Sequence, residues 1–524
     1  MQKILEGSLL YRLIAVAAAW CGKHWRSSRI VNWFLSPRWS REASESSIFT
    51  RIWLGVHRFI FFIFEKLRLN KLLCGSIFAM PFIWCFIAVA LAPLITTMML
   101  LVISLACFGS LLLAFGCDRE RKLAYSPSNK YILIFVLIYV AATLTSVSVA
   151  GSLRGGALTA LFTLFPIVLQ NSVKSRRQLD TLVYALVMSG VAVSLYGIYQ
   201  YVFGAIGASA WVDSSMFSDI GVRVYSTLDN PNVLSMYLLL VIPFAGSCIL
   251  NARGVVARLF FIGCLGVMIA CMLFTFSRGG WLGLLIAAAI FLVMLDRRFI
   301  LVGIAGLIVL YFALPEVILD RLLSVGNTGD SSTSFRVFIW LGTLNMLRDY
   351  WFTGIGPGVA AYKRVYPLYS YNAVYSPHSH NLYLQITCDT GFSGIAIFIV
   401  IFFTYFRDVC SALSRERDKA SKRLQIAAVS SIFGFLAQGM TDYSFYNYRV
   451  MFVFWLVLGI GIIAARRSRL EGGAGGVPAG SDSVPAEGGA AASANNGSDS
   501  APAEGGSIPA GSDSADALPQ GAKL

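Results

Sequence analysis

Charged residues are scarce in this chain. Of its 524 residues, 13% are Asp, Glu, Lys or Arg and 57% are hydrophobic. Soluble domains carry about 25% charged residues, and the mean hydropathy here is +0.69. The shortage is concentrated in a series of runs that are nearly free of charge. This composition excludes an ordinary soluble domain.

Motifs for metals, nucleotides and disulfides are also lacking. The ten cysteines form no Cys-x-x-Cys pair, and most lie inside apolar runs, where cysteine serves as a small packing residue. No Gly-rich nucleotide loop, Walker motif or Asp-x-Asp metal–sugar signature occurs at a credible position. We therefore expect no cofactor, and a cytoplasmic enzyme that uses nucleotide sugars is disfavoured.

The charge-poor runs have the length of membrane-spanning helices. A helix rises about 1.5 Å per residue, so about 20 residues cross the ~30 Å core of a bilayer. The runs are continuously apolar rather than alternating, which favours helices over barrel strands. We predict an all-α integral membrane protein with about twelve transmembrane helices. The predicted spans are residues 75–91, 94–116, 130–150, 154–171, 180–203, 232–250, 257–276, 279–295, 298–314, 391–407, 424–440 and 449–465.

The basic residues indicate how these helices are oriented. Lys and Arg collect in the cytoplasmic loops of membrane proteins. With residues 1–74 inside and the spans alternating, 33 of the 42 Lys and Arg lie on the inner side. We therefore expect both termini in the cytoplasm. The net charge of +15 follows from this bias and does not indicate nucleic-acid binding.

The chain divides into three parts. Residues 1–74 are basic and aromatic, which is typical of a cytoplasmic segment at the membrane surface, although a flexible leader fits as well. Residues 75–465 form the membrane domain, whose largest outer loop, 315–390, is too rich in aromatic residues to be disordered. Residues 466–524 contain low-complexity repeats of small and polar residues, so we expect a disordered cytoplasmic tail.

Two arginines stand at the outer ends of predicted spans. Arg223 precedes an Asn-Pro-Asn turn at 230–232, and an arginine at this depth either snorkels to lipid headgroups or binds an anion. Arg278 lies in a Ser-Arg-Gly-Gly link between two spans, where Ser277 adds a hydroxyl and the glycines leave room for a ligand. Because a planar guanidinium suits phosphate or pyrophosphate, we favour ligand binding over anchoring for Arg278.

Two of the four histidines close the large outer loop. His378 and His380 form a His-x-His pair that could bind a metal, but no carboxylate or cysteine cluster accompanies it. Imidazole can also act as a general base near neutral pH, and we favour this role. Arg336, on a helix expected over 332–349, fits either an anionic or sugar ligand or a salt bridge. Asp442 fits either the orientation of a base or a helix cap.

Taken together, these motifs resemble the O-antigen ligase and Wzy polymerase superfamily of bacterial membrane glycosyltransferases. The resemblance rests on Arg223 before its Asn-Pro-Asn turn and on Ser-Arg-Gly at 277–279. Its most specific part is the His380-Asn381-x-x-Leu384 motif at the end of the large outer loop. It covers roughly residues 75–465.

The resemblance implies a GT-C-related fold in the bacterial cytoplasmic membrane and a role in cell-envelope polysaccharide synthesis. It also implies metal-independent transfer of a polyprenyl-pyrophosphate-linked glycan to an acceptor hydroxyl on the outer side, with inversion. His380 would activate the acceptor, while Arg278 and Arg223 would neutralise the leaving pyrophosphate. The expected substrate-binding residues are Ser277, Arg336, His378, Asn381 and Asp442. The acceptor (glycan, lipid or protein) and the choice between ligase and polymerase stay open.

A transporter or flippase for lipid-linked glycans is the alternative. Twelve helices and interfacial arginines suit it too. Such carriers, however, contain internal repeats and polar residues near the membrane midplane. Here no repeat relates the two halves, and the candidate residues gather at one surface. A third interpretation, with less support, is a scaffold that kept the fold and lost the activity.

Overall fold

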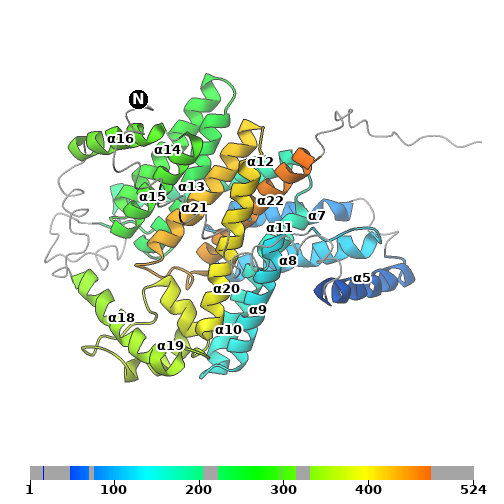
Figure 1. Ribbon diagram of the computed structural model, residues 1–524, viewed down its shortest axis with the longest axis horizontal. Helices are drawn as coiled ribbons and strands as arrows, with labels where there is room; N and C mark the ends of the chain where they lie inside the picture. The colour runs from blue at the N-terminus through cyan, green and yellow to red at the C-terminus, as the bar shows by residue number, and fades with distance from the viewer. Residues whose placement is uncertain are drawn as a thin grey trace, which may run out of the picture. The chain divides into compact units, whose positions relative to one another are not determined.

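The computed structural model describes residues 16, 20, 48–69, 76–124, 126–204, 222–296, 298–313 and 331–473, and every regular element within them is a helix (Figure 1). The predicted all-α class is confirmed. Most of the predicted N-terminal segment, the beginning of the predicted outer loop and nearly all of the predicted tail lie outside the described residues.

Each of the twelve predicted spans coincides with a helix, and one of them, 154–171, is built from parts of two. A helix preceding the spans, α5, covers Ile48–Lys66. The helices of the membrane domain are α7 (Met80–Leu91), α8 (Thr97–Cys117), α9 (Pro127–Leu144), α10 (Val149–Thr163), α11 (Phe165–Ser172), α12 (Arg176–Phe203), α13 (Pro231–Asn251), α14 (Val255–Phe274), α15 (Arg278–Leu295), α16 (Phe299–Ala313), α20 (Leu382–Leu413), α21 (Lys419–Gln438) and α22 (Tyr448–Gly473).

Within the described residues, nine helical segments are long and apolar enough to cross a membrane, with α10 and α11 counted as one. The helices α7 and α16 fall short in length, with 12 and 15 residues. The helix α21 has the length but carries basic and polar residues. It packs against α13, α15 and α22, so it needs little apolar surface toward lipid. The count of twelve spans therefore stays a prediction.

The centre of the bundle is formed by α13 and α22. In their most apolar windows, 83% and 89% of the residues are buried, against 22% in α14 and in α15. A helix that is apolar on all sides and buried is an interior helix, whereas α14 and α15 present their apolar side chains outward. One continuous apolar core joins the central helices to their neighbours.

The predicted outer loop is itself folded over residues 331–381, the part that the structure describes. It contains α18 (Ser331–Tyr350), α19 (Val359–Val365) and the short 3-10 helix η4 (Tyr366–Leu368). These elements enclose a separate small core that includes Ile339, Tyr362 and Tyr366. Figure 1 shows α18 and α19 beside the adjacent ends of α20 and α10. The prediction of an ordered loop with helices is confirmed for the part that the structure describes.

A break in α20 anchors this loop to the bundle. Gly391 has φ 68°, which interrupts the helix. At the break, the Ile355 N–H donates to the Cys388 carbonyl at 2.7 Å, and the Phe392 N–H donates to the Trp351 carbonyl at 2.7 Å. A Cβ atom at Gly391 would collide with the neighbouring backbone, so only glycine fits. These two hydrogen bonds therefore fix the position of the loop along α20.

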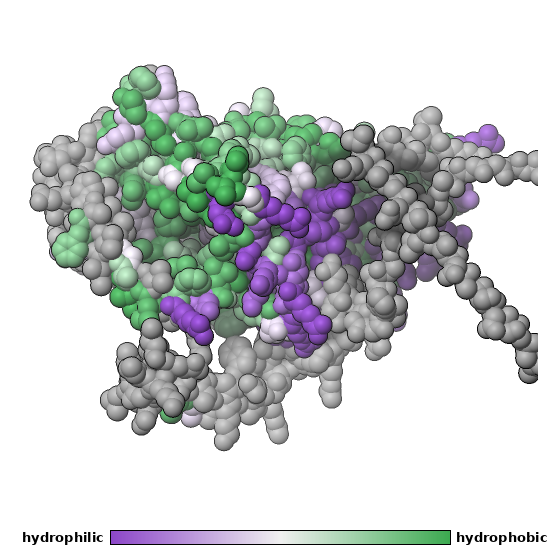
Figure 2. Space-filling view, turned by 90° about the horizontal axis from the view of Figure 1, so that it is seen from above, coloured by the Kyte–Doolittle hydropathy of each residue, from purple (hydrophilic) through white to green (hydrophobic). Residues whose placement is uncertain are grey.

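Basic residues of α21 and α22 lie at the opposite end of the bundle. Arg423 donates to the Leu250 carbonyl at 2.6 Å, and Arg467 donates to the Lys174 carbonyl at 3.2 Å. Figure 2, which views the molecule from above, shows hydrophilic side chains gathered beside an apolar surface. The outer-loop helices and this basic end thus lie at opposite ends of the same helices (Figure 1).

Candidate active site

His380 stands at the end of the outer loop, two residues before α20. Its backbone has φ 48°, in the left-handed region that non-glycine residues rarely adopt. The Trp340 indole N–H of α18 donates to the His380 carbonyl at 3.3 Å, and the Phe335 ring lies edge-on to the imidazole. A strained backbone held by surrounding contacts is typical of functional positions.

His380, Asp442 and Arg336 form the closest group among the predicted residues. His380 Nδ1 lies 3.3 Å from Asp442 Oδ1, and Arg336 Nη2 lies 3.7 Å from Asp442 Oδ2. If Nδ1–H donates to the carboxylate, Nε2 keeps its lone pair. The acid therefore selects the tautomer in which His380 can accept a proton through Nε2.

Asp442 remains ionised in this setting. Burial by itself raises the pKa of the carboxyl group, but the hydrogen bond from His380 and the charge of Arg336 outweigh burial and hold that pKa below its usual value. The carboxylate also accepts the backbone N–H of Tyr443 at 2.8 Å. A fixed negative charge is thus available to stabilise the imidazolium that forms when His380 takes up a proton.

His378 is buried behind His380. Its Nδ1 accepts the backbone N–H of His380 at 3.3 Å, and its ring stacks on Tyr446 with centroids 4.8 Å apart. Burial, together with the neighbouring His380, lowers the pKa of His378 to about 3. His378 therefore stays neutral near pH 7 and supports the backbone of His380, while His380 remains the better candidate for the base.

Arg336 is held from its own helix. Its Nη1 donates to the Ser332 hydroxyl at 2.7 Å and to the Ser332 carbonyl at 3.3 Å. The Nε atom is buried and has no hydrogen-bond partner among the described residues. A buried donor without a partner is uncommon. Both interpretations of Arg336, salt bridge and ligand contact, are compatible with this geometry.

Arg278 is the first residue of α15 and reaches toward α18. Its Nη2 lies 3.4 Å from the Thr333 hydroxyl, three residues before Arg336. Two guanidinium groups thus come from different helices to the beginning of α18. The positive end of the α15 helix dipole lies at the same place. Arg336 thus places positive charge beside Asp442, while the Arg278 guanidinium lies at Thr333, three residues earlier on α18.

Ser277 and the glycines of this link have structural roles. The Ser277 hydroxyl caps α15 by accepting the Gly280 N–H at 3.3 Å, and it accepts a hydrogen bond from Ser235 of α13. A Cβ atom at Gly280 would strike Ser235, and one at Gly279 would meet Thr441 at 3.0 Å. The space on the Cβ side of both glycines is therefore occupied by neighbouring residues of the chain.

Arg223 lies in the segment before α13 and is buried against the end of α14. Its Nε donates to the Thr275 carbonyl at 2.9 Å, and its Nη2 donates to Asn232 Oδ1 at 3.1 Å. The Val224 N–H adds a bond to the Phe274 carbonyl at 3.1 Å. These contacts fix the turn that precedes Arg278. They favour a positioning role for Arg223 over the direct pyrophosphate contact that its motif implies.

Asn381 caps α20. Its Oδ1 accepts the backbone N–H groups of Tyr383 and Leu384, each at 3.0 Å. Its Nδ2 donates to the Met440 carbonyl at 2.7 Å. The side chain that was expected to bind substrate therefore orients the helix start and ties it to the loop that carries Asp442.

Sequence reasoning missed several residues of the site. Gln438 connects the helices by donating to Ser235 at 2.7 Å and to the Asn232 carbonyl at 3.3 Å. The rings of Tyr446 and Tyr443 enclose His378. A dense aromatic run at 443–448 was the available signal for the tyrosines. No local signal identified Gln438.

The described part of the chain contains no group of three or more His, Cys, Asp or Glu side chains that could hold a metal ion. The chemistry that the site can offer on its own is proton acceptance at His380, a fixed carboxylate and several guanidinium donors. That set suits a reaction in which a hydroxyl loses a proton and an anionic group leaves.

Comparison with known proteins gives one family. Residues 263–399 match a family model described as O-antigen ligase. The matched segment contains Arg278, Arg336, His378, His380 and Asn381 but neither Arg223 nor Asp442. No curated protein sequence is similar enough to the chain to count as a match. The resemblance drawn from the motifs is confirmed over this segment.

Proposed function

We propose that the chain transfers a polyprenyl-pyrophosphate-linked glycan to an acceptor hydroxyl, and the match of residues 263–399 to the O-antigen ligase model supports this proposal. The observation that carries the proposal is the contact of His380 Nδ1 with Asp442 Oδ1 at 3.3 Å, next to Arg336. This group has the parts that a glycosyl transfer from pyrophosphate needs, a base with its orienting acid and nearby cations.

In the proposed reaction, the acceptor oxygen attacks the anomeric carbon of the glycan. Its proton passes to Nε2 of His380, and the resulting imidazolium is stabilised by the Asp442 carboxylate. The bond between the anomeric carbon and the pyrophosphate oxygen breaks, and the electron pair leaves with the pyrophosphate. Attack from the face opposite the leaving group inverts the configuration at the anomeric carbon.

The leaving pyrophosphate needs compensation for its developing charge. We assign this role to Arg278, with Arg336 beside it at the beginning of α18. Fixed guanidinium groups can stabilise such charge without reorganising during the reaction. Arg223 would act through its bonds to Thr275 and Asn232, by holding the turn that carries Arg278. No metal takes part in this scheme.

We place the reaction at the outer face of the bacterial cytoplasmic membrane. Two observations support this placement. The candidate residues lie at the ends of α13, α14, α15, α20 and α21 that are far from Arg423 and Arg467, and an excess of basic residues is characteristic of the cytoplasmic side. Both termini would then be cytoplasmic.

The function is tested with cells that lack the chain. Such cells should accumulate a glycan on polyprenyl pyrophosphate, and the wild-type chain should clear it, whereas the His380→Ala variant should not. The purified chain in nanodiscs should release sugar-free polyprenyl pyrophosphate from this lipid in the presence of acceptor and EDTA. Movement of the lipid-linked glycan across the membrane without formation of sugar-free polyprenyl pyrophosphate would instead identify a flippase.

A further inference from the structure

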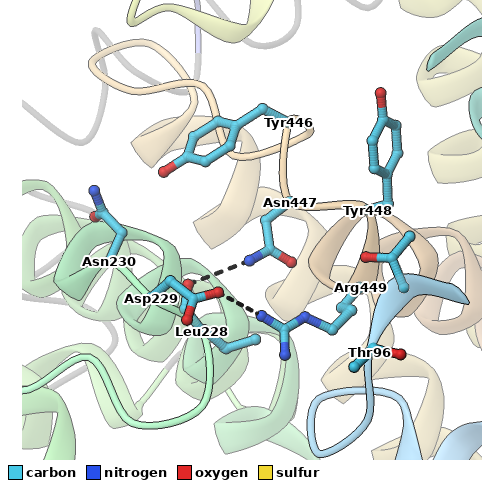
Figure 3. Close-up of a pocket in the computed structure, with 9 residues that line it drawn as sticks. Thr96, Leu228, Asp229, Asn230, Tyr446, Asn447, Tyr448 and Arg449 are labelled. Carbon is cyan, nitrogen blue, oxygen red and sulfur yellow. Dashed lines mark hydrogen bonds and ion pairs between the residues drawn. The ribbon is translucent and has the colours of Figure 1, made fainter. Parts of the chain in front are cut away.

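A cavity of about 580 Å³ lies beside the candidate active site (Figure 3). It opens between the beginnings of α8, α13 and α22, the same end of the bundle that carries His380. Its volume falls in the range of about 300–1,000 Å³ that is typical of small-ligand pockets. The lining residues are Thr96, Thr97, Leu228, Asp229, Asn230, Tyr446, Asn447, Tyr448 and Arg449.

Tyr446 belongs to both the cavity and the site. Its ring lines the cavity and stacks on the ring of His378 at 4.8 Å with an interplanar angle of 16°. His378 in turn holds the backbone of His380. A ligand in the cavity would therefore be separated from His380 by the side chains of Tyr446 and His378.

The polar groups of the cavity are fixed by contacts across it. Arg449 Nη2 lies 2.8 Å from Asp229 Oδ2, and Asn447 Nδ2 donates to the Leu228 carbonyl at 3.2 Å; Figure 3 shows both contacts. Within the described residues, Asn447 Oδ1 is buried without a hydrogen-bond partner. Arg449, Asp229 and Asn447 are thus held in defined orientations by the protein itself.

The backbone here is strained as it is at His380. Asp229 has φ 66° and the nearby Ser226 has φ 53°, both in the left-handed region. Non-glycine residues in this region cost about 1 kcal/mol or more, and such residues cluster at ligand sites. The turn that presents Asp229 to Arg449 is therefore maintained by its surroundings.

The lining discriminates between classes of ligand. A pyrophosphate needs an excess of positive charge, but the single arginine of the lining is paired with the single carboxylate. A polyprenyl chain needs an apolar lining, and Leu228 is the only aliphatic hydrophobic residue among the lining residues. Hydroxyls, side-chain amides, an Arg–Asp pair and tyrosine rings instead match a sugar, which donates and accepts at each hydroxyl and offers apolar C–H faces to aromatic rings.

We propose that this cavity binds a sugar ring of the glycan and thereby positions the glycan against His380. The proposal rests on the proposed function for the identity of the glycan. The sugar ring comes from either the donor or the acceptor. Arg449 supplies directed donors, Thr97 a hydroxyl, and Tyr446 a stacking surface. None of these three residues belongs to the motifs of the family resemblance.

The test measures binding by the full chain in nanodiscs. One probe is the glycan released by mild acid from the lipid-linked glycan that accumulates in cells without the chain. The other probe is undecaprenyl pyrophosphate without sugar. The variants are Arg449→Gln and the nearly isosteric Thr97→Val. Matched controls are Arg364→Gln and Thr145→Val, because Arg364 and Thr145 are exposed and bond to the Val147 and Ala141 carbonyls.

We expect Arg449→Gln to raise the Kd for the released glycan about ten-fold or more, the effect of losing a charged hydrogen bond. Thr97→Val should raise it about three-fold, and neither variant should change the Kd for the sugar-free lipid. Loss of affinity for the sugar-free lipid to the same extent would overturn the proposal in favour of a pyrophosphate site. The proposal would also be overturned if both variants bound the glycan and transferred it with the same kinetics as the wild type.

Two further results distinguish a donor sugar from an acceptor sugar, and the cavity proposal from the proposed function. If Arg449→Gln leaves the binding of donor glycan unchanged but raises the KM for the acceptor, the sugar belongs to the acceptor and the cavity still binds sugar. If the wild type binds the released glycan through Arg449 but forms no sugar-free polyprenyl pyrophosphate, sugar binding by the cavity is confirmed while the proposed function fails. The two proposals can therefore fail independently.

Discussion

His380 Nδ1 lies 3.3 Å from Asp442 Oδ1 and joins two loops that are 62 residues apart in the chain. One loop leads into α20, and the other connects α21 with α22. The contact gives the imidazole a defined tautomer and a charged neighbour. It also brings His380 to the carboxylate that Arg336 of α18 approaches to 3.7 Å.

The first prediction concerns the two histidines. His380→Ala should lower glycan transfer about 100-fold or more, because the proton acceptor is lost. His378→Ala should leave substantial transfer, since the pKa of His378, lowered to about 3, leaves this residue a supporting role. Transfer is measured as polyprenyl pyrophosphate released by protein of verified monodispersity. Equal losses in both variants would reassign the base.

Asp442→Asn tests the orienting acid. The variant keeps the shape of the side chain but removes the charge that selects the His380 tautomer, so kcat should fall about 100-fold or more while binding of donor changes little. Asp349→Asn is the matched control, because Asp349 is an exposed carboxylate of the outer loop that bonds to Tyr369. A loss confined to KM would contradict an orienting role.

Arg336→Lys separates a directed guanidinium from a simple positive charge. Lysine cannot contact Ser332 and Asp442 in the same way, so transfer should fall about ten-fold or more although the charge is kept. Arg364→Lys, at an exposed site on α19, should behave as wild type. Full activity of Arg336→Lys would show that charge alone is sufficient there.

Stability should depend on pH through His378. The pKa of this residue is about 3 in the folded protein, and about 6.5 is expected for the unfolded chain. Between these values only the unfolded chain binds the proton, so the folded state loses stability as the pH falls below about 6.5. In detergent, the drop in the thermal unfolding midpoint from pH 7.5 to pH 5 should be smaller for His378→Gln than for the wild type. Identical drops would contradict a buried neutral imidazole.

Gly391→Ala tests the anchor of the outer loop. A side chain there would meet the Phe352 backbone and would have to adopt a positive φ, at a cost of about 1–3 kcal/mol. The unfolding midpoint should fall and proteolysis of the outer loop should become faster. Gly266→Ala in α14 is the control, because nothing lies within 4 Å of an added Cβ atom there. An unchanged midpoint for Gly391→Ala would refute the anchor.

Local patterns in the sequence predicted much of the fold. The thickness of a bilayer sets the length of an apolar run, and that length can be counted without knowledge of neighbouring helices. The predicted runs accordingly coincide with helices. Interior helices such as α21 are harder to recognise as spans, because a helix surrounded by protein tolerates the polar residues that lipid would exclude.

The sequence by itself also determined the nature of the candidate residues. An arginine next to a helix start and a histidine before an apolar run are costly near a membrane, so their presence indicated function. Local patterns could not tell whether Ser277 and Asn381 bind a ligand or cap a helix. The structure shows both as caps, which satisfy backbone N–H groups that the first helical turn leaves unpaired.

Tertiary structure alone decided which residues meet. The pairing of His380 with Asp442, the stacking of Tyr446 on His378 and the cavity beside Arg449 depend on which helices are neighbours. Neighbourhood results from packing across the whole bundle and leaves no periodic signal in any one segment. Counting basic residues predicted that the candidate residues share one side of the membrane. Only packing brought the proposed base, its carboxylate partner and the proposed sugar cavity together there.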